Sequence, residues 1–300
     1  MESSRDSEWT SPFRKDVLDG QVALITGGGS GIGLEIARQF GFHGACVSLM
    51  GRRSAVLEEA VAVLRAQGVR ATYVVGDVRD GKSCEIAVEQ TLKAFGGKLD
   101  IVVNSAAGNF LSRAQDLTSN GFKTVMEIDA GGTFNICRAS FPHLKAAKGS
   151  IINISANLHY GATWFQAHAS AAKSAIDSLT RSLALEWGPE GVRVNSVAPG
   201  PIADTAGMAK LAPTADGSGA QKVGSSVPLG RMGTKTEMGL VCVFLASNAA
   251  SYVTGSVVVA DGGHWLQREP MVPPELVTKL SKKLEGSTKN IGRATYRSKL

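Results

Sequence analysis

The sequence contains no run of 18 consecutive apolar residues, although 43% of its 300 residues are hydrophobic. A helix that spans a membrane needs about 20 such residues, so no membrane span is predicted. The N-terminal region also lacks the apolar stretch of a secretion signal. The length and the mean hydropathy of +0.02 suffice for one large core. No Pro/Ser-rich linker interrupts the chain before residue 264, which favours a single domain.

Aromatic residues are scarce, at 6% of the chain, and none is interleaved with basic residues in the manner that stacks nucleobases. The net charge of +6 therefore does not predict binding to nucleic acid, and it fits a phosphate-rich small molecule better. The four cysteines have no CxxC or His-paired spacing. We expect buried, reduced thiols and no metal site.

Short apolar runs rich in β-branched residues alternate with longer amphipathic stretches from residue 20 onward. The runs predict strands at 22–26, 45–50, 72–75, 101–104, 150–155, 193–197 and 257–260. The stretches between them predict helices at 31–42, 56–67, 82–95, 121–145, 168–187 and 235–246. Strands that are apolar throughout and alternate with helices indicate a parallel sheet. The predicted fold is α/β, a single-domain Rossmann fold with a doubly wound sheet of about seven strands and helices on both faces.

Two segments depart from this pattern. Residues 1–18 are polar and are expected to form a flexible arm that precedes a domain over residues 19–264. Residues 202–227 are rich in Gly, Ala, Ser, Thr and Pro and interrupt the last β-α unit. Ligands bind at the carboxyl ends of the strands in such folds, so this segment is interpreted as a substrate lid, with an ordinary loop as the alternative.

The expected C-terminal tail, residues 265–300, is polar and rich in lysine after Pro274. It ends in Ser298-Lys299-Leu300, a tripeptide that a peroxisomal import receptor binds when it stands at a free C-terminus. A loose polar tail would expose such a signal. The sequence therefore predicts a peroxisomal protein that contacts this receptor.

A glycine-rich run, TGGGSGIG over residues 26–33, follows a predicted strand and opens a predicted helix. Gly27 permits a sharp turn, Gly31 lets the backbone approach a pyrophosphate, and Gly33 lets the helix pack on the strand. Unpaired N–H groups at the start of the helix attract the phosphates. This context predicts a dinucleotide site. Four more residues of the run are assigned to it: Gly28, Gly29, Ser30 and Ile32.

The second predicted strand runs into Arg52 and Arg53 rather than into an acidic residue. An acidic side chain at this place binds the ribose hydroxyls of NAD, whereas guanidinium groups bind a 2′-phosphate. The pair therefore predicts NADP(H), with a solvated basic turn as the alternative. Asp77 and Val78 follow the third strand, where they are expected to hold the adenine.

The segment NSAAG follows the fourth predicted strand, and its small residues would let the backbone pass close to the nicotinamide ribose at Asn104 and Ala106. Together with the glycine run and the PGPI segment after the sixth strand, it resembles the short-chain dehydrogenase/reductase family over residues 20–264. In that family the PGPI segment flanks the nicotinamide carboxamide, which implies cofactor contacts from Pro199, Gly200 and Ile202. The resemblance also implies a homo-oligomer, either a dimer or a tetramer.

The family's catalytic residues are Asn, Ser, Tyr and Lys, the last two spaced YxxxK. Ser155 and Lys173 match this pattern, and Lys173 is expected to bind the nicotinamide ribose. Ala169 stands in the tyrosine position and Asp129 in the asparagine position, so ordinary carbonyl reduction is not expected. This combination resembles the peroxisomal 2,4-dienoyl-CoA reductases of the family. It implies NADPH-dependent reduction of 2,4-dienoyl-CoA to 3-enoyl-CoA in the β-oxidation of unsaturated fatty acids.

The chemistry of a conjugated thioester accounts for the missing tyrosine. Hydride addition at the far end of the diene gives a dienolate, which is protonated on carbon rather than on oxygen. Asp129 and Lys173 could order a water for this step. A purely structural or Lys-orienting role for Asp129 stays open, as do Tyr160, His159 and His168 as proton donors.

Coenzyme A carries three phosphates, so basic side chains are expected along its path. Arg52, Arg79 and Arg113 are assigned to the acyl-CoA substrate, and Phe110 is assigned to the acyl channel. Two other functions stay open at this point. One is another acyl-CoA or ketone reductase that uses Tyr160 as its acid, and the other is a non-catalytic scaffold that binds NADP(H).

Overall fold

The computed structural model describes residues 11–211, 218–268, 270–273 and 275–284. The chain forms two compact units, Met1–Trp265 and Leu266–Leu300. Within the second unit, the described residues include a helix over 275–284. The tripeptide Ser298-Lys299-Leu300 lies outside the described part of the chain. No helix that the structure describes has both the length and the apolar character needed to span a membrane.

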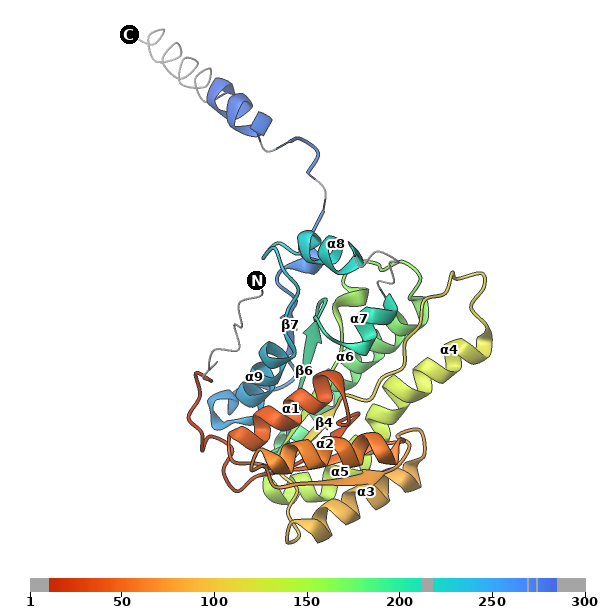
Figure 1. The fold of residues 1–300 in the computed structure, drawn as a ribbon, viewed down its shortest axis with the longest axis vertical. Coiled ribbons are helices and arrows are strands. Elements are labelled where there is room, and N and C mark those ends of the chain that lie inside the picture. The colour runs from red at the N-terminus through yellow and green to blue at the C-terminus, as the bar shows by residue number, and fades with distance from the viewer. Residues whose placement is uncertain (1–10, 212–217, 269, 274, 285–300) are drawn as a thin grey trace. The chain divides into compact units, whose positions relative to one another are not determined.

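Seven parallel strands form one sheet in the first unit, in the order β3-β2-β1-β4-β5-β6-β7 (Figure 1). Their bounds are β1 Val22–Thr26, β2 Cys46–Gly51, β3 Ala71–Val75, β4 Ile101–Asn104, β5 Ser150–Ile154, β6 Arg193–Pro199 and β7 Val257–Ala260. Strands β1, β4 and β5 are buried along their whole length, as continuous apolar runs require. The predicted doubly wound sheet is confirmed. The strand order reverses between β1 and β4, which is where such folds bind ligands.

Two hydrophobic cores flank the sheet. Helices α1 (Gly31–Phe42), α2 (Ser54–Ala66) and α9 (Lys235–Ala246) contribute to one core, and α1 packs against α9 (Figure 1). Helices α3 (Gly81–Ala94), α5 (Gly132–Ala147) and α6 (Ala167–Trp187) contribute to the other. The amphipathic stretches of the sequence therefore place helices on both faces of the sheet, as predicted.

One predicted helix contains a feature that its pattern does not indicate. Helix α4 (Ser119–Met126), the π-helical turn η1 (Glu127–Gly131) and α5 follow one another without a break, where a helix over 121–145 is predicted. A π turn adds a residue to a helix and shifts the faces on either side, and such turns are frequent at functional sites. This turn contains Asp129.

Residues 11–18 differ from the expected flexible arm. Leu18 is fully buried in the core beside α1, and Phe13 packs against the same core. Ser11 Oγ lies 2.7 Å from Nε2 of His43, which follows α1. Apolar side chains within this polar segment thus attach it to the domain, and the packed part of the chain begins before the expected boundary at residue 18. Residues 1–10 lie outside the description.

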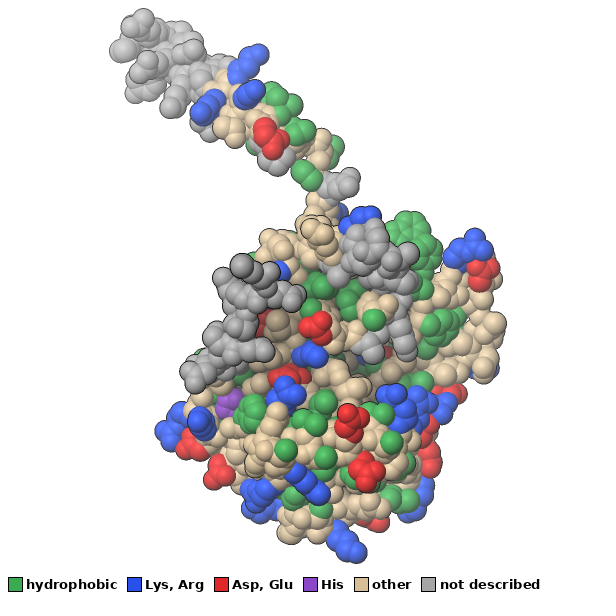
Figure 2. All heavy atoms as spheres, viewed as in Figure 1, with side chains coloured by type: hydrophobic (Ala, Val, Ile, Leu, Met, Phe, Trp, Pro, Cys, Tyr) green, Lys and Arg blue, Asp and Glu red, His purple; other side chains and the backbone are tan. Residues whose placement is uncertain are grey.

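The segment after β6 contains α7 (Ala206–Leu211) and α8 (Ser218–Ser226), while residues 212–217 are not described. An isolated bridge pairs Ile202 with Gly233, which brings the two ends of this segment together. Over the face of the first unit seen in Figure 2, basic and acidic side chains are interspersed rather than gathered in a stripe of one sign.

Candidate active site

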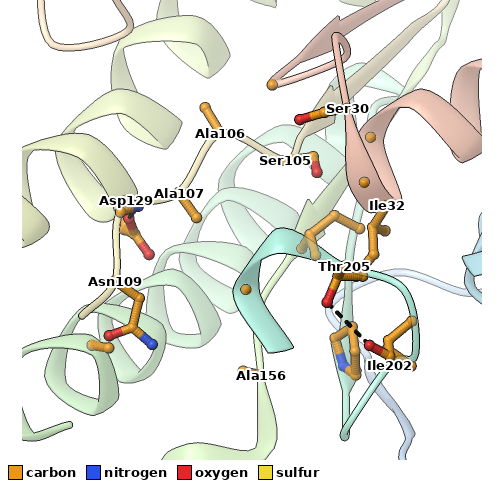
Figure 3. A pocket seen from close by; sticks show the side chains of 18 of the residues that line it. Ser30, Ile32, Ser105, Ala106, Ala107, Asn109, Asp129, Ala156, Ile202 and Thr205 are labelled. Carbon is orange, nitrogen blue, oxygen red and sulfur yellow. Dashed lines mark hydrogen bonds between the residues drawn. The ribbon is translucent and has the colours of Figure 1, made fainter. Parts of the chain in front are cut away.

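A cavity of about 650 Å³ opens at the carboxyl ends of the strands. Its walls come from the β1–α1 loop, from the residues that follow β2 to β6, and from the predicted lid segment. Ile202 and Thr205 of that segment lie across the cavity from Asn109 and Asp129 (Figure 3). Met208 of α7 lines the cavity as well. The segment therefore forms a wall of this cavity, and its role as a substrate lid stays a prediction.

The glycine-rich run shapes one side of the cavity. Gly27 and Gly31 have φ angles of +65° and +59°, which residues with a side chain rarely adopt. A Cβ on Gly33 would lie 2.6 Å from the carbonyl oxygen of Gly27, so α1 approaches the loop too closely for any side chain. Helix α1 has no side-chain cap and no acidic residue in its first turn, which leaves N–H groups for an anion. The residues of the run that line the cavity are Gly27, Gly29, Ser30, Gly31, Ile32 and Gly33.

Basic and acidic side chains stand at the ends of β2 and β3. Arg52 and Arg53 are exposed and line the cavity directly after β2. Asp77 and Val78 line it after β3. Nη2 of Arg79 donates to Oδ2 of Asp77 at 2.6 Å, and this hydrogen bond lowers the pKa of the carboxyl group. Arg79 itself is not among the residues that line the cavity, so the structure shows it as a partner of Asp77.

Two residues of the predicted cofactor site, Asn104 and Gly28, lie inside the protein and do not line the cavity. Asn104 is 4% exposed, and its Nδ2 donates to Oδ1 of Asn153 at 2.9 Å, which joins β4 to β5. A Cβ on Gly28 would lie 2.8 Å from Cδ2 of Leu49, so this glycine permits close packing against β2. Neither residue lines the cavity, whereas Ala106, which follows β4, does. The sequence placed Asn104 at a strand end and Gly28 in the glycine-rich run, but it did not indicate which way the Asn104 side chain points or that Gly28 packs on β2.

An acidic and a basic side chain meet inside the cavity. Nζ of Lys173 lies 3.0 Å from Oδ2 of Asp129 and donates to the carbonyl oxygen of Ile154 at 3.0 Å. Oδ1 of Asp129 accepts the N–H of Gly108 at 2.7 Å. Apart from the ion pair, Oδ2 has no hydrogen-bond partner among the described residues, although Asp129 is 1% exposed. A buried carboxylate oxygen left in this state can bind a water or a ligand group inside the cavity.

The predicted serine and the residues at the end of β6 complete this wall. Ser155 is 3% exposed, lines the cavity, and its Oγ donates to the carbonyl oxygen of Lys173 at 3.4 Å. Pro199, Gly200 and Ile202 also line the cavity, and their contacts with a cofactor stay predictions. The predicted catalytic residues are thus brought together with most of the predicted cofactor residues around one space.

The alternative proton donors lie elsewhere. Ala169 lines the cavity at the position of the family's tyrosine, whereas Tyr160 does not line it. The Tyr160 hydroxyl donates to Oδ2 of Asp177 at 3.3 Å, and burial together with this carboxylate raises the pKa of the phenol. Nε2 of His159 lies 2.8 Å from the same Asp177 oxygen. Both side chains are therefore committed to a buried carboxylate outside the cavity.

His168 and two of the predicted substrate residues are also not part of the lining. His168 is fully buried, and burial lowers the pKa of its imidazole. The ring of Phe110 packs on it, with centroids 4.4 Å apart. Arg113 is exposed and pairs with Asp116, whose Oδ2 lies 2.6 Å from its Nε. The structure gives these residues local partners and does not bring Phe110 or Arg113 to the cavity.

The cavity also contains residues that the sequence analysis did not find. Asn109, Gln166, Leu158, Thr163 and His264 all line it. Their positions in the chain follow no periodic pattern, because they lie in loops around β4, β5 and β7 that only the folded sheet brings together. Asn109 was within reach of a prediction, since it directly follows the NSAAG segment.

Comparisons with known proteins agree with this geometry. A family model described as enoyl-(acyl carrier protein) reductase matches residues 27–264. A protein of Arabidopsis thaliana named peroxisomal 2,4-dienoyl-CoA reductase [(3E)-enoyl-CoA-producing] is 50% identical over 285 residues, which cover 92% of this chain and 94% of that protein. A Danio rerio protein of the same name is 49% identical over 264 residues, covering 87% of this chain and 86% of that protein. A solved short chain dehydrogenase from Bacillus anthracis superposes with a TM-score of 0.76 at 36% identity, covering 84% of this chain and 100% of that one.

Proposed function

The chain belongs to the short-chain dehydrogenase/reductase family, and we infer from this that it reduces 2,4-dienoyl-CoA thioesters with a nicotinamide cofactor. Relatives that are about half identical over most of their length carry this activity in their names. In the structure, the proposal depends on one observation above all. Asp129 and Lys173 pair inside the cavity, while the family's tyrosine position holds Ala169. The cavity therefore contains the acid–base pair of Asp129 and Lys173, but it has no tyrosine at position 169 to protonate a carbonyl oxygen.

The residues around the cavity fit a dinucleotide. Gly27 and Gly33 let the β1–α1 loop pack directly against Ser105 and the start of α1, and the uncapped start of α1 suits a pyrophosphate. We propose that the cofactor is NADP(H), because Arg52 and Arg53 can bind a 2′-phosphate with charge-assisted hydrogen bonds. When bound, the reduced nicotinamide supplies a hydride to the substrate.

We assign proton delivery to a water held by Asp129 and Lys173. The ammonium group of Lys173 has three N–H donors, of which one meets Ile154 and one faces Asp129. The third is available to a ribose hydroxyl of the cofactor. Oδ2 of Asp129 can accept a hydrogen bond from the water, which then protonates C2 of the dienolate. Ser155 keeps the backbone of Lys173 in register with the end of β5.

The product that this route gives is a 3-enoyl-CoA. A hydride adds to C5 of the dienoyl chain, the double bonds shift to C3–C4 and C1–C2, and a proton from water ends on C2. The net reaction consumes NADPH, one proton and the dienoyl thioester, and it yields NADP⁺ and the 3-enoyl thioester. The two relatives described above carry the same product in their names.

The experiment that tests this function is an assay of substrate choice. Purified protein is mixed with NADPH and either a 2,4-dienoyl-CoA or a 3-ketoacyl-CoA of equal chain length, and NADPH absorbance is followed. We expect consumption with the dienoyl ester alone. Consumption with only the 3-ketoacyl ester would favour a carbonyl reductase, and NADPH binding without turnover of either would favour a scaffold.

We also propose a peroxisomal location, because the relatives described above are named peroxisomal. Ser298-Lys299-Leu300 remains the predicted receptor signal. A fluorescent protein fused ahead of residue 1 should collect in peroxisomes, and deletion of these three residues should release it to the cytosol. The predicted dimer or tetramer stays a prediction that sedimentation of the purified protein can test.

A further inference from the structure

Gln166 is a polar residue of the cavity that the proposed mechanism leaves without a role. It directly precedes α6, it is 7% exposed, and it lines the cavity. Its side chain makes no capping hydrogen bond to the helix that follows it. A buried amide needs hydrogen-bond partners, so the direction in which each end of this amide points is informative.

A chain of hydrogen bonds fixes the orientation of the Gln166 amide. The backbone N–H of Phe110 can only donate, and it donates to Oδ1 of Asn109 at 2.8 Å. Asn109 must therefore present its Nδ2 to the other side, where it donates to Oε1 of Gln166 at 2.6 Å. The Nε2 group of Gln166 is thus turned away from Asn109. Within the described part of the chain, this nitrogen has no hydrogen-bond acceptor, so its two N–H groups are available to a ligand in the cavity.

Backbone strain directly before Gln166 supports a functional role. Phe165 has a φ angle of +62°, a left-handed conformation that is costly for a bulky residue. The carbonyl oxygen of Phe165 accepts the N–H of Ser112 at 3.0 Å, which ties this conformation to the loop that contains Asn109. Strained residues persist where the surrounding contacts over-determine them, and they cluster at active sites.

The loop after β4 and helix α6 position both Gln166 and the pair of Asp129 and Lys173. Asn109 follows Gly108, whose N–H binds Asp129, and Asn109 and Asp129 lie next to each other at the cavity wall (Figure 3). Helix α6 begins directly after Gln166 and contains Lys173 about two turns further on. A substrate atom bound by Nε2 of Gln166 would therefore lie close to C2, the carbon that the proposed mechanism protonates.

We propose that Gln166 is a further catalytic residue, whose Nε2 donates hydrogen bonds to the thioester carbonyl oxygen of the substrate. This proposal rests on the proposed function. When hydride adds at C5, the electron pair of the carbonyl π bond moves onto this oxygen, and the oxygen returns the pair when C2 is protonated. A preorganised donor aimed at this oxygen stabilises the charge that develops there. The partial positive charge at the start of α6 acts in the same direction.

The first test replaces Gln166 by methionine, which has a similar length but no N–H donor. Loss of one donor at a developing oxyanion lowers kcat by roughly 10²- to 10³-fold. We expect this loss for Gln166→Met with the 2,4-dienoyl-CoA, together with an unchanged Kd for NADPH. Gln67→Met makes the same chemical change at an exposed position after α2 and should leave kcat unchanged.

The second test changes the orientation of Gln166 without replacing it. In Asn109→Asp, one carboxylate oxygen still accepts the N–H of Phe110, and the other can only accept. Gln166 should then turn its Nε2 toward the aspartate and present Oε1 to the substrate. We expect a loss of kcat similar to that of Gln166→Met. The double variant should lose little beyond Gln166→Met alone, because Asn109 acts as a positioning residue through Gln166. A charge effect of the aspartate would instead lower kcat equally on both backgrounds.

A spectroscopic readout separates carbonyl polarisation from general damage. With NADP⁺ in place of NADPH, the bound 2,4-dienoyl-CoA cannot be reduced, and a hydrogen bond to its carbonyl shifts the absorption band of the dienoyl chromophore to longer wavelength. The shift should be present in the wild type and absent in both single variants. A wild type that does not consume NADPH with the dienoyl ester would overturn the proposed function. An active wild type with Gln166→Met or Asn109→Asp within about threefold of its kcat would overturn only the role of Gln166.

Discussion

Replacement of Asp129 separates its chemical role from its structural one. Asp129→Ala removes the partner of a Lys173 side chain that is 9% exposed and leaves the N–H of Gly108 without its acceptor. Removal of one partner of a buried ion pair costs about 3–5 kcal/mol, and we expect the lower end because Lys173 lines a cavity that water can enter. Asp129→Asn keeps the volume and the acceptor for Gly108 but loses the negative charge. It should therefore lose less stability than Asp129→Ala.

Both variants should lose activity to a similar extent, because neither can hold a water as an acid–base pair with Lys173. Positioned acid catalysis contributes roughly 10²- to 10⁴-fold to kcat. Steady-state oxidation of NADPH with a 2,4-dienoyl-CoA gives kcat, titration of NADPH gives its Kd, and urea unfolding gives the free energy of unfolding. Asp129→Asn with a kcat within about threefold of the wild type would refute the assignment. Such a result would show that the charge of Asp129 is not needed for proton delivery and would leave the side chain a structural role only.

Three further predictions concern the cofactor, the rival acid and a helix start. Arg52→Ala with Arg53→Ala should lower the preference of kcat/KM for NADPH over NADH by roughly tenfold or more, since each charge-assisted hydrogen bond contributes about 1.5–3 kcal/mol; an unchanged preference would exclude the 2′-phosphate contact. Tyr160→Phe should retain kcat, because its hydroxyl binds Asp177 outside the cavity and its raised pKa holds the proton; a large loss would restore Tyr160 as the acid. The ion pair and capping box of Glu237 lower its pKa to about 2, so the stability it contributes is present above the unfolded pKa near 4.3 and is lost as the pH falls toward 2. Glu237→Gln should therefore lower the free energy of unfolding at pH 7 by about 1 kcal/mol and flatten its decline between pH 5 and 2, as urea titrations at several pH values would show.

The local pattern of apolar and polar residues was sufficient to predict the strands of the sheet and the helices that cover it. The continuous apolar strands predicted a buried parallel sheet, and β1 and β7 have the bounds that were expected for them. The π turn around Asp129 could not be predicted in the same way. A helical pattern of apolar residues reports which face is buried, but one inserted residue in the middle of a long helix changes that pattern too little to be recognised.

The site was predictable where backbone conformation decides it and less so where side-chain direction does. Gly27 and Gly33 stand where a strand meets a helix, and their roles follow from that context. Asn104 lies at a strand end that faces the site, yet its amide bridges β4 and β5 inside the sheet. Arg79 follows β3 but binds Asp77. Gln166 gave no signal at all, because its orientation depends on a hydrogen-bond partner 57 residues away in the chain.

The origin of the two hydrogen atoms added to the substrate tests the proposed reaction most directly. With NADPH that carries deuterium on the transferred position, in ordinary water, the 3-enoyl-CoA product should contain deuterium only at C5. With ordinary NADPH in deuterated water, it should contain deuterium only at C2. Mass and NMR analysis of the product give both positions. Deuterium from the cofactor at C3, or a hydroxyacyl-CoA product, would contradict hydride addition at the far end of the diene and the carbon protonation assigned to Asp129 and Lys173.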